Sequence, residues 1–339
     1  MNILVTGGTG MTGAYLLLKL IETEHTVKAI HRKSSNLEIT KNIFNYYNEN
    51  GDELFSKINW AEGDLTDYHF VNSAMENIDF VYHVAAMVSF KPSEKSLMIH
   101  NNVQGTANIV NSALTNNVKK VCHVSSVAAL GDASGGKALT EDMERTDYKN
   151  VSGYAISKLR SEKEVWRAAA EGLNMVIVNP SVILGAGNWN HGSPRMIKTV
   201  WEGLKYYTKG ENGFVSVEDV VNVMIKLTES DISNERFILS AENLPFRTVF
   251  NYMADHLNKK RAHIYSTSFM LHSLKTFDNI RYYISGKEPR LTKNTLKSAQ
   301  KIHTCSNEKL IQAIQYEFKP IEDSIKEICE IFLTEFEPK

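Results

Sequence analysis

In the first half of the chain, short apolar runs alternate with longer stretches whose apolar residues recur at helical spacing. The apolar runs comprise residues 2–6, 26–31, 58–63, 79–86, 120–126 and 174–180. They are continuously apolar, which is typical of strands buried on both faces. The helical stretches comprise residues 14–22, 39–48, 68–75, 97–114 and 154–171. Strands separated by helices of this length predict βαβ crossovers and therefore an α/β fold with a doubly wound parallel sheet.

The pattern changes after Pro180. Residues 181–198 are rich in Gly, Asn and Ser and predict a long loop. An amphipathic helix over 216–229, a strand over 235–240 and a mostly helical remainder follow. We therefore expect a nucleotide-binding domain formed by residues 1–180 and about 214–240, and a smaller substrate lobe formed by about 181–213 and 241–339.

A glycine-rich turn, TGGTGMTG, directly follows the first predicted strand and opens the first predicted helix. Gly7 would permit a tight turn, Gly10 would let backbone amides approach a ligand, and Gly13 would let the helix pack close to the sheet. A helix N-terminus favours anions because its N–H groups are unpaired and its dipole is positive there. The turn therefore predicts a dinucleotide pyrophosphate site made of Gly7, Thr9, Gly10, Met11, Thr12 and Gly13.

The end of the second predicted strand indicates which dinucleotide is bound. NAD-preferring sites place an acidic residue there for the ribose 2′-hydroxyl, whereas a basic residue suits the 2′-phosphate of NADP. The sequence VKAIHRKSS has no acid, and it places Arg32 and Lys33 at this position. This favours NADP as the cofactor, with NAD possible. The alternative interpretation is a solvated basic loop.

Composition and charge mainly exclude classes of function. The chain has 38 basic and 39 acidic residues, and this balance gives no electrostatic reason to bind nucleic acid or an anionic membrane. Cys122, Cys305 and Cys329 are widely separated, with no CxxC pair and no His cluster, so we expect reduced thiols and no metal. The N-terminal apolar run is too short for a signal peptide, and no apolar stretch is long enough to span a bilayer. We therefore expect a cytoplasmic protein.

Further motifs follow in a fixed order: GDLTD (63–67), HVAA (83–86), NVQGTAN (102–108), VSSVAALG (124–131), YAISK (154–158) and NPSVILGAG (179–187). Together with the glycine turn, they resemble the extended short-chain dehydrogenase/reductase family. Within that family the sequence is most similar to the dihydroflavonol-reductase and 3β-hydroxysteroid-dehydrogenase-like branch. The resemblance spans about residues 1–240 and implies a Rossmann sheet that binds a nicotinamide dinucleotide.

Tyr154 and Lys158 are spaced so that both project from one face of a helix. A phenol has a pKa near ~10, and a nearby ammonium group stabilises the phenolate and brings the pKa toward neutral pH. This pair predicts proton transfer by Tyr154. The resemblance adds Ser126, rather than Ser125, as the residue that orients the substrate oxygen, and it implies that Lys158 also binds the nicotinamide ribose.

The resemblance assigns further residues to the cofactor. Asp64 and Leu65 would contact the adenine, and Ala85, Ala86 and Met87 would line the path past the ribose. Val103 would pack nearby, and Ser125 would lie close to the cofactor. The nicotinamide pocket would be shaped by Pro180, Ser181 and Val182.

Other residues admit two interpretations. Asn102 either stabilises the active-site backbone or a water, or caps the start of a helix. His83 is expected to be a hydrogen-bonded core histidine rather than a catalyst. The loop from Gly185 to Arg195, with Trp189 and His191, is expected to border the substrate pocket, where Trp189 either stacks on a ring or anchors the loop.

Two surface features are weaker indications. The basic residues between Lys287 and Lys301 would either attract an anionic substrate or form a solvated helix face. The helices that start near Leu97 and Tyr154 resemble those through which family members form dimers.

Three classes of function compete. The first is an NADP(H)-dependent oxidoreductase that interconverts a carbonyl and a secondary alcohol of a small molecule. The second is a nucleotide-sugar epimerase with tightly bound NAD, and the third is a non-catalytic NAD(P) sensor. A dehydratase would need an acid directly after Ser126, where Val127 and Ala128 stand. The presence of both Tyr154 and Lys158 argues against a sensor, and the oxidoreductase is the favoured hypothesis.

Overall fold

The main sheet of the computed structural model is parallel throughout. The structure describes residues 1–23, 25–89, 91–131, 133, 137–146, 148, 151–267, 270 and 300–337. Within these residues, seven strands pair in the order β10-β6-β5-β4-β1-β2-β3. They are β1 (Asn2–Thr6), β2 (Thr26–His31), β3 (Asn59–Glu62), β4 (Phe80–His83), β5 (Lys120–Val124), β6 (Met175–Pro180) and β10 (Glu235–Leu239). The order reverses between β1 and β4, which is where doubly wound sheets bind ligands.

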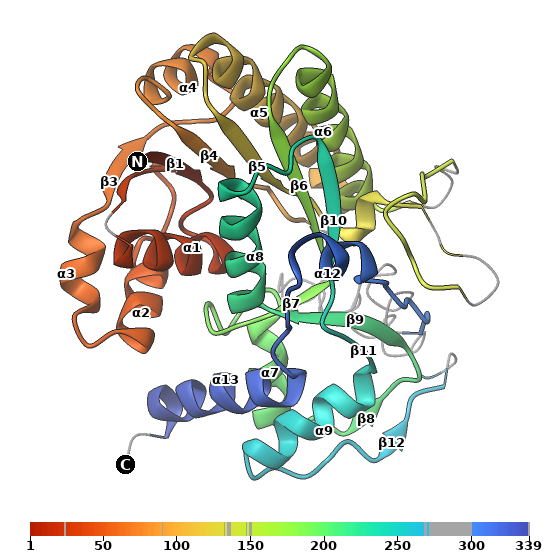
Figure 1. Cartoon of the computed structure of the whole chain (residues 1–339). Coiled ribbons are helices and arrows are strands. Elements are labelled where there is room, and N and C mark those ends of the chain that lie inside the picture. The colour runs from red at the N-terminus through yellow and green to blue at the C-terminus, as the bar shows by residue number, and fades with distance from the viewer. Residues whose placement is uncertain are drawn as a thin grey trace.

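Helices cover both faces of this sheet because successive strand residues point to opposite sides. Ile3 and Val5 pack with one set of helices, whereas Leu4 packs with the other. The first set contains α1 (Met11–Glu22), α2 (Glu38–Tyr47) and α8 (Val217–Glu229). The second set contains α4 (Tyr68–Ala74), α5 (Lys95–Thr115) and α6 (Gly153–Ala170). Figure 1 shows the two layers on either side of the strands. The predicted α/β fold is confirmed.

A second hydrophobic core lies below the main sheet in the view of Figure 1. It is built from α7 (Pro194–Trp201), α9 (Phe246–His256) and α13 (Ile321–Phe336) around a small sheet of strands β11, β9 and β7. The bounds of these strands are β7 (Val182–Leu184), β9 (Glu211–Ser216) and β11 (Glu242–Pro245). The remaining elements are α3 (Gly51–Ser56), α12 (Glu308–Ile314), the paired strands β8 (Tyr206–Tyr207) and β12 (Ile264–Tyr265), and the 3₁₀ turns η1 (Pro92–Glu94) and η2 (Val127–Ala129).

The prediction of one long loop over residues 181–198 is wrong in part. This segment contains β7, which pairs with β9, and the start of α7, which begins at Pro194. The pairing partner of β7 lies about thirty residues further along the chain, so no local sequence pattern predicted this strand. The division into a nucleotide-binding domain and a substrate lobe stays a prediction. The basic residues from Lys287 to Lys297 lie outside the described residues.

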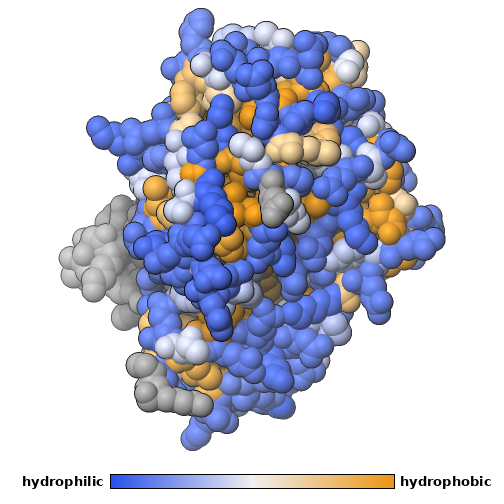
Figure 2. All heavy atoms as spheres, turned by 60° about the vertical axis from the view of Figure 1, so that its left-hand side comes forward, coloured by the Kyte–Doolittle hydropathy of each residue, from blue (hydrophilic) through white to orange (hydrophobic). Residues whose placement is uncertain are grey.

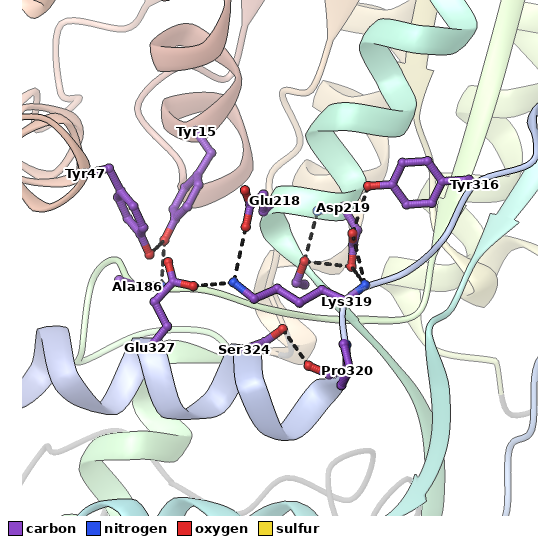
Figure 3. A network of polar contacts seen from close by, with 11 residues as sticks. Tyr15, Tyr47, Ala186, Glu218, Asp219, Tyr316, Lys319, Pro320, Ser324 and Glu327 are labelled. Atoms are coloured by element: carbon purple, nitrogen blue, oxygen red, sulfur yellow. Dashed lines mark hydrogen bonds and ion pairs between the residues drawn. The ribbon is translucent and has the colours of Figure 1, made fainter.

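Polar contacts tie the C-terminal segment to the helices of the main sheet (Figure 3). The Lys319 ammonium lies between the carboxylates of Glu218, at 3.4 Å, and Glu327. Asp219 accepts hydrogen bonds from the hydroxyl groups of Tyr316, at 2.8 Å, and Ser216, at 2.9 Å. These contacts join α8 to α13 and to the segment that precedes it.

The face shown in Figure 2 is mostly hydrophilic, and its hydrophobic residues form separate patches. None of the described helices is both long and apolar enough to cross a membrane. All three cysteines are free and buried, as expected. In the part of the chain that the structure describes, no group of three or more metal-ligating side chains comes together.

Lys120 has a structural role that its charge alone did not indicate. Its side chain is buried, and its ammonium group donates to the carbonyl oxygens of Leu227, Ser230 and Ile232, just where α8 ends. A cation at a helix C-terminus satisfies unpaired carbonyl groups and interacts favourably with the helix dipole.

We predict that Lys120→Met lowers the free energy of unfolding by about 1–3 kcal/mol, because three carbonyl groups lose a charged donor. Chemical denaturation of the free protein measures the change. Lys119→Met is the matched control, because Lys119 is exposed and pairs with Asp79 at the surface. Equal effects of both substitutions would contradict the capping role.

Candidate active site

The glycine turn between β1 and α1 is shaped by two very close backbone approaches. Gly7 has φ +76°, and a Cβ added there would lie 2.6 Å from the backbone nitrogen of Ala85 at the end of β4. A Cβ on Gly13 would lie 2.1 Å from the carbonyl oxygen of Gly7. The Gly10 amide donates to that same carbonyl at 3.0 Å and closes the turn. Side chains are excluded at Gly7 and Gly13 because the chain folds back on itself.

Gly10 differs from these two glycines. A Cβ placed on it would meet only the Gly7 carbonyl oxygen, at 3.5 Å, so no protein contact requires glycine at this position. Gly10 is also the N-cap of α1 and has no side chain that could cap the helix, and the first turn of α1 holds no acid. The uncapped amides and the space above them suit a negatively charged ligand. A dinucleotide pyrophosphate fits this turn on both counts.

A cavity of about 410 Å³ opens above the turn, at the point where the strand order reverses. It is lined by these predicted cofactor residues: Gly7, Thr9, Gly10, Met11, Thr12, Gly13, Arg32, Asp64, Leu65, Ala85, Ala86 and Met87. It is also lined by residues that the sequence analysis did not single out, including Ile30, His31, Ser35, Gly63, Thr66, Asn101 and Gly105. Among them, Gly63 is required by packing, because a Cβ there would lie 2.4 Å from the Phe70 ring.

Arg32 and Lys33 directly follow β2. The order of the motifs predicts that the adenosine part of the cofactor binds there. Both basic residues line a neighbouring hollow of about 510 Å³ with Ser34, Glu62 and Asp64. The Asp64 carboxylate accepts hydrogen bonds from the backbone and side chain of Thr66, and these bonds, together with the Arg32 charge, hold the pKa of Asp64 below its usual range. The hollow therefore combines two basic side chains with two carboxylates.

Ser126, which follows β5, and Tyr154, in the first turn of α6, come together. Ser126 follows β5 and is the N-cap of η2, and its Oγ accepts a hydrogen bond from the Ala128 amide at 3.2 Å. Tyr154 lies in the first turn of α6, which is capped by the Ser152 hydroxyl. Burial raises the pKa of Tyr154, and a hydrogen bond with the Ser126 side chain acts in the opposite direction.

Lys158 is one helical turn beyond Tyr154 and has a side chain that is only 4% exposed. Its Nζ donates to the carbonyl oxygen of Val124, the last residue of β5, at 2.8 Å. Burial lowers the pKa of Lys158 to about 8, and the carboxylate of Glu162 acts against this shift. The ammonium form is therefore present at neutral pH and is anchored beside the strand end that carries Ser126.

Asn102 lies in the middle of α5, so the helix-cap interpretation is wrong. Its Oδ1 accepts from the Met87 amide at 2.7 Å, and its Nδ2 donates to the Met87 carbonyl at 3.0 Å and to the Ser157 hydroxyl at 3.1 Å. Asn102 thus fixes the backbone of a cavity-lining residue. This is the first of the two roles that the sequence left open.

His83 meets the expectation of a hydrogen-bonded core histidine. Its ring nitrogens contact the hydroxyl groups of Thr6, at 2.8 Å, and Thr106, at 3.0 Å. Burial lowers the pKa of His83 to about 3, so the imidazole is neutral. His83 also lines the cavity.

The loop that was expected to border the substrate pocket is anchored on α13 through Trp189. Trp189 is buried, packs edge-on against Phe332 and donates from Nε1 to the Glu335 carboxylate at 2.7 Å. The anchoring interpretation of Trp189 is therefore the correct one. His191 and Arg195 are exposed. The cavity of about 410 Å³ is not lined by these two residues or by the predicted cofactor residues Lys33, Val103, Ser125, Tyr154, Lys158, Pro180, Ser181 and Val182. The predicted catalytic residue Ser126 does not line it either.

Comparison with known proteins identifies the family. The model of the NAD dependent epimerase/dehydratase family matches residues 3–239. The chain belongs to this family, and it is an NAD(P)-dependent enzyme with oxidoreductase or epimerase activity.

The similar proteins include sequence relatives that are named as reductases and solved structures of epimerases. Sterol demethylase protein B of Methylococcus capsulatus is 27% identical over 75% of this chain and 74% of its own length. A putative dihydroflavonol 4-reductase of Synechocystis is 33% identical over 53% of this chain and 49% of its own length. Among solved structures, the UDP-glucose 4-epimerase of Thermotoga maritima superposes with a TM-score of 0.78 at 20% identity and covers 99% of this chain and 100% of the epimerase chain. At that identity the likeness concerns the fold.

We predict that Gly10→Ala leaves the melting temperature of the free protein unchanged within about 2 °C, because the added Cβ has space and the backbone there is extended. The same Cβ points toward the ligand space, so binding of NADP⁺ and NAD⁺ should weaken at least about tenfold. Gly13→Ala is the matched contrast, since its Cβ would clash with Gly7 and lower the stability itself. Calorimetric melting and cofactor titration separate the two, and normal cofactor binding by Gly10→Ala would contradict the assigned site.

Proposed function

We propose that this enzyme is an NADP(H)-dependent oxidoreductase that interconverts a carbonyl and a secondary alcohol on a small-molecule substrate. The observation that carries the proposal is the assembly of Ser126, Tyr154 and Lys158 around the end of β5, where the side chains of Ser126 and Tyr154 are hydrogen-bonded. Such an assembly can hold a substrate oxygen and exchange a proton with it. The bound nicotinamide would donate or accept the hydride.

Each side chain has a distinct task in this proposal. In the reducing direction, the Tyr154 hydroxyl gives its proton to the substrate oxygen, while the Ser126 hydroxyl donates a hydrogen bond to the same oxygen. The Lys158 ammonium stabilises the phenolate that results, because an opposite charge nearby favours the ionised phenol. In the oxidising direction the phenolate takes the proton back.

The same proposal assigns the cofactor contacts. Gly7 and residues 9–13 would bind the pyrophosphate, Asp64 and Leu65 the adenine, and residues 85–87 the ribose path. Arg32 and Lys33 would bind the 2′-phosphate of NADP, since a guanidinium group pairs well with phosphate oxygens. We further propose that Val103 packs near the ribose path and that Ser125 lies close to the cofactor. Pro180, Ser181 and Val182 would shape the nicotinamide pocket.

A nucleotide-sugar epimerase with tightly bound NAD is the second candidate. The hollow beside Arg32 also contains Glu62 and Asp64, and carboxylates there would oppose a 2′-phosphate. An epimerase would keep its cofactor through purification, whereas the reductase would exchange it at each turnover. Identification of any nucleotide that co-purifies therefore discriminates between the two. Dehydration has no support, because Val127 and Ala128 follow Ser126.

We predict that Tyr154→Phe lowers kcat by at least about a thousandfold and leaves NADPH affinity within about threefold, because only the proton donor is removed. NADPH oxidation is followed by absorbance with dihydroflavonol and cinnamoyl-CoA probes. These probes follow the named relatives, which include a dihydroflavonol 4-reductase and a cinnamoyl-CoA reductase, both of Arabidopsis thaliana. Near-normal turnover by the variant on either probe would rule out the assigned role.

We predict that Arg32→Ala weakens NADPH binding by at least about tenfold and NADH binding by less than about twofold, because only NADPH carries the 2′-phosphate. Fluorescence titration of both cofactors measures the ratio. Lys57→Ala serves as a control, since Lys57 is an exposed cation that directly follows α3 and pairs with Glu53 on that helix. Equal losses for the two cofactors would show that Arg32 does not contact the phosphate.

A further inference from the structure

Glu162 is a buried carboxylate that lies one helical turn beyond Lys158 on α6. Its side chain is only 1% exposed. A carboxylate that is removed from water destabilises the fold unless charged or polar partners compensate it. Glu162 has two such partners, one on each oxygen, and they come from two neighbouring strands of the main sheet.

The first partner is Asn179, near the end of β6. Its Nδ2 donates to Glu162 Oε1 at 2.6 Å and to the backbone carbonyl oxygen of Ser126 at 3.0 Å. Both of these atoms can only accept, so the orientation of the amide group is fixed with its nitrogen between them. Asn179 therefore connects the Glu162 carboxylate directly to the backbone of Ser126.

The second partner is Arg236 on β10, the strand next to β6. Its Nη1 lies 3.2 Å from Glu162 Oε2, and its remaining nitrogens donate to the carbonyl oxygen of Glu141. The Glu141 carboxylate in turn accepts from the backbone amide of Ile238 at 2.8 Å. The guanidinium group is thus held in place from the far side, which makes it a fixed counter-charge for Glu162.

We propose that Glu162 and Asn179 are positioning residues of the active site: Asn179 holds the backbone that presents Ser126 to Tyr154, and Glu162 anchors Asn179 while its negative charge faces Lys158. The inference rests on the proposed function for its catalytic meaning. Its physical content stands on the hydrogen bonds that link Glu162 through Asn179 to Ser126, and on the place of Glu162 one helical turn beyond Lys158 on α6.

The charged groups around Glu162 and Lys158 determine in which direction a substitution shifts the pKa of Lys158. Lys158 faces the Glu162 carboxylate from its own helix and the neutral rings of His83 and His123 from β4 and β5, and Tyr154 lies one helical turn before it on α6. Arg236 and Glu141 lie beyond Glu162. Removing the Glu162 charge takes away an attraction and leaves Arg236 unopposed, and both changes lower the pKa of Lys158.

The test compares Glu162→Gln and Asn179→Ala with Glu164→Gln, in which a carboxylate of the same helix that pairs with Arg167 at the surface is neutralised. The free protein is labelled with [ε-¹³C]lysine, and the Lys158 resonance is identified by its loss in Lys158→Met. We expect the pKa of Lys158 to fall by at least about half a unit in Glu162→Gln and to stay within about 0.2 units in the control. A second sample carries [ζ-¹³C]tyrosine, with Tyr154 identified through Tyr154→Phe. Its resonance should move in Asn179→Ala, because the hydrogen bond from Ser126 is disturbed, and not in the control.

Variants that lose thermal stability but leave both resonances as in the wild-type protein would show that the cluster is only structural, and would overturn the inference. Movement of the Lys158 pKa and of the Tyr154 resonance supports it. Both readouts are taken without substrate, so their failure is separate from failure of the proposed function, which is decided by turnover of Tyr154→Phe.

Discussion

The site depends on one backbone contact, the approach of the Gly13 Cα to the Gly7 carbonyl, where a Cβ would lie 2.1 Å from the oxygen. This contact brings the start of α1 directly over the end of β1, and the positive φ of Gly7 makes the reversal possible. Because Gly7 is also pressed against Ala85, the turn is registered against β4 across the switch point of the sheet. The amides of residues 11–13 at the start of α1, which no side chain caps, then lie beside the cavity, and their direction is set by the fold.

The same helix connects the cofactor cavity with the second hydrophobic core. The Met11 side chain lines the cavity, and a Cβ on Gly185 would lie 3.0 Å from its Sδ. One turn further on, the Tyr15 hydroxyl accepts from the Ala186 amide at 3.0 Å and donates to the Tyr47 hydroxyl at 2.5 Å (Figure 3). The segment that follows β7 is therefore packed against the helix that would carry the pyrophosphate. A displacement of α1 would therefore also displace this segment.

What could be predicted from the sequence was encoded locally. The apolar runs, the helical spacings and the glycine turn gave the parallel sheet and most of the cavity lining, because each is a short-range signal with a definite structural cause. Asn102, Trp189 and Glu162 were not assigned their roles from the sequence. Their partners, Met87, Glu335 and Asn179, lie at separations that no periodicity reports, and polar contacts of this kind exist only after the chain has folded.

Burial of charged groups lowers the stability of the fold, and this site contains both a buried ammonium group and a buried carboxylate. Lys158 and Glu162 are both almost inaccessible to water, and they are compensated by groups near the carboxyl ends of β5 and β6 and by Arg236 near the start of β10. Such an arrangement fixes atoms at defined positions, which is what proton transfer requires. The ends of β5 and β6 supply their share of these partners because parallel strands bring their carboxyl ends to one edge of the sheet.

The most direct test of this account is a crystal structure of the protein with NADP⁺ and a substrate alcohol. The account predicts the diphosphate on the amides of residues 11–13, and the Tyr154 oxygen within about 3 Å of the substrate oxygen, whose carbon lies about 3–3.5 Å from the nicotinamide C4. A cofactor bound elsewhere, or a Tyr154 oxygen too far from the substrate oxygen to pass a proton, would contradict it.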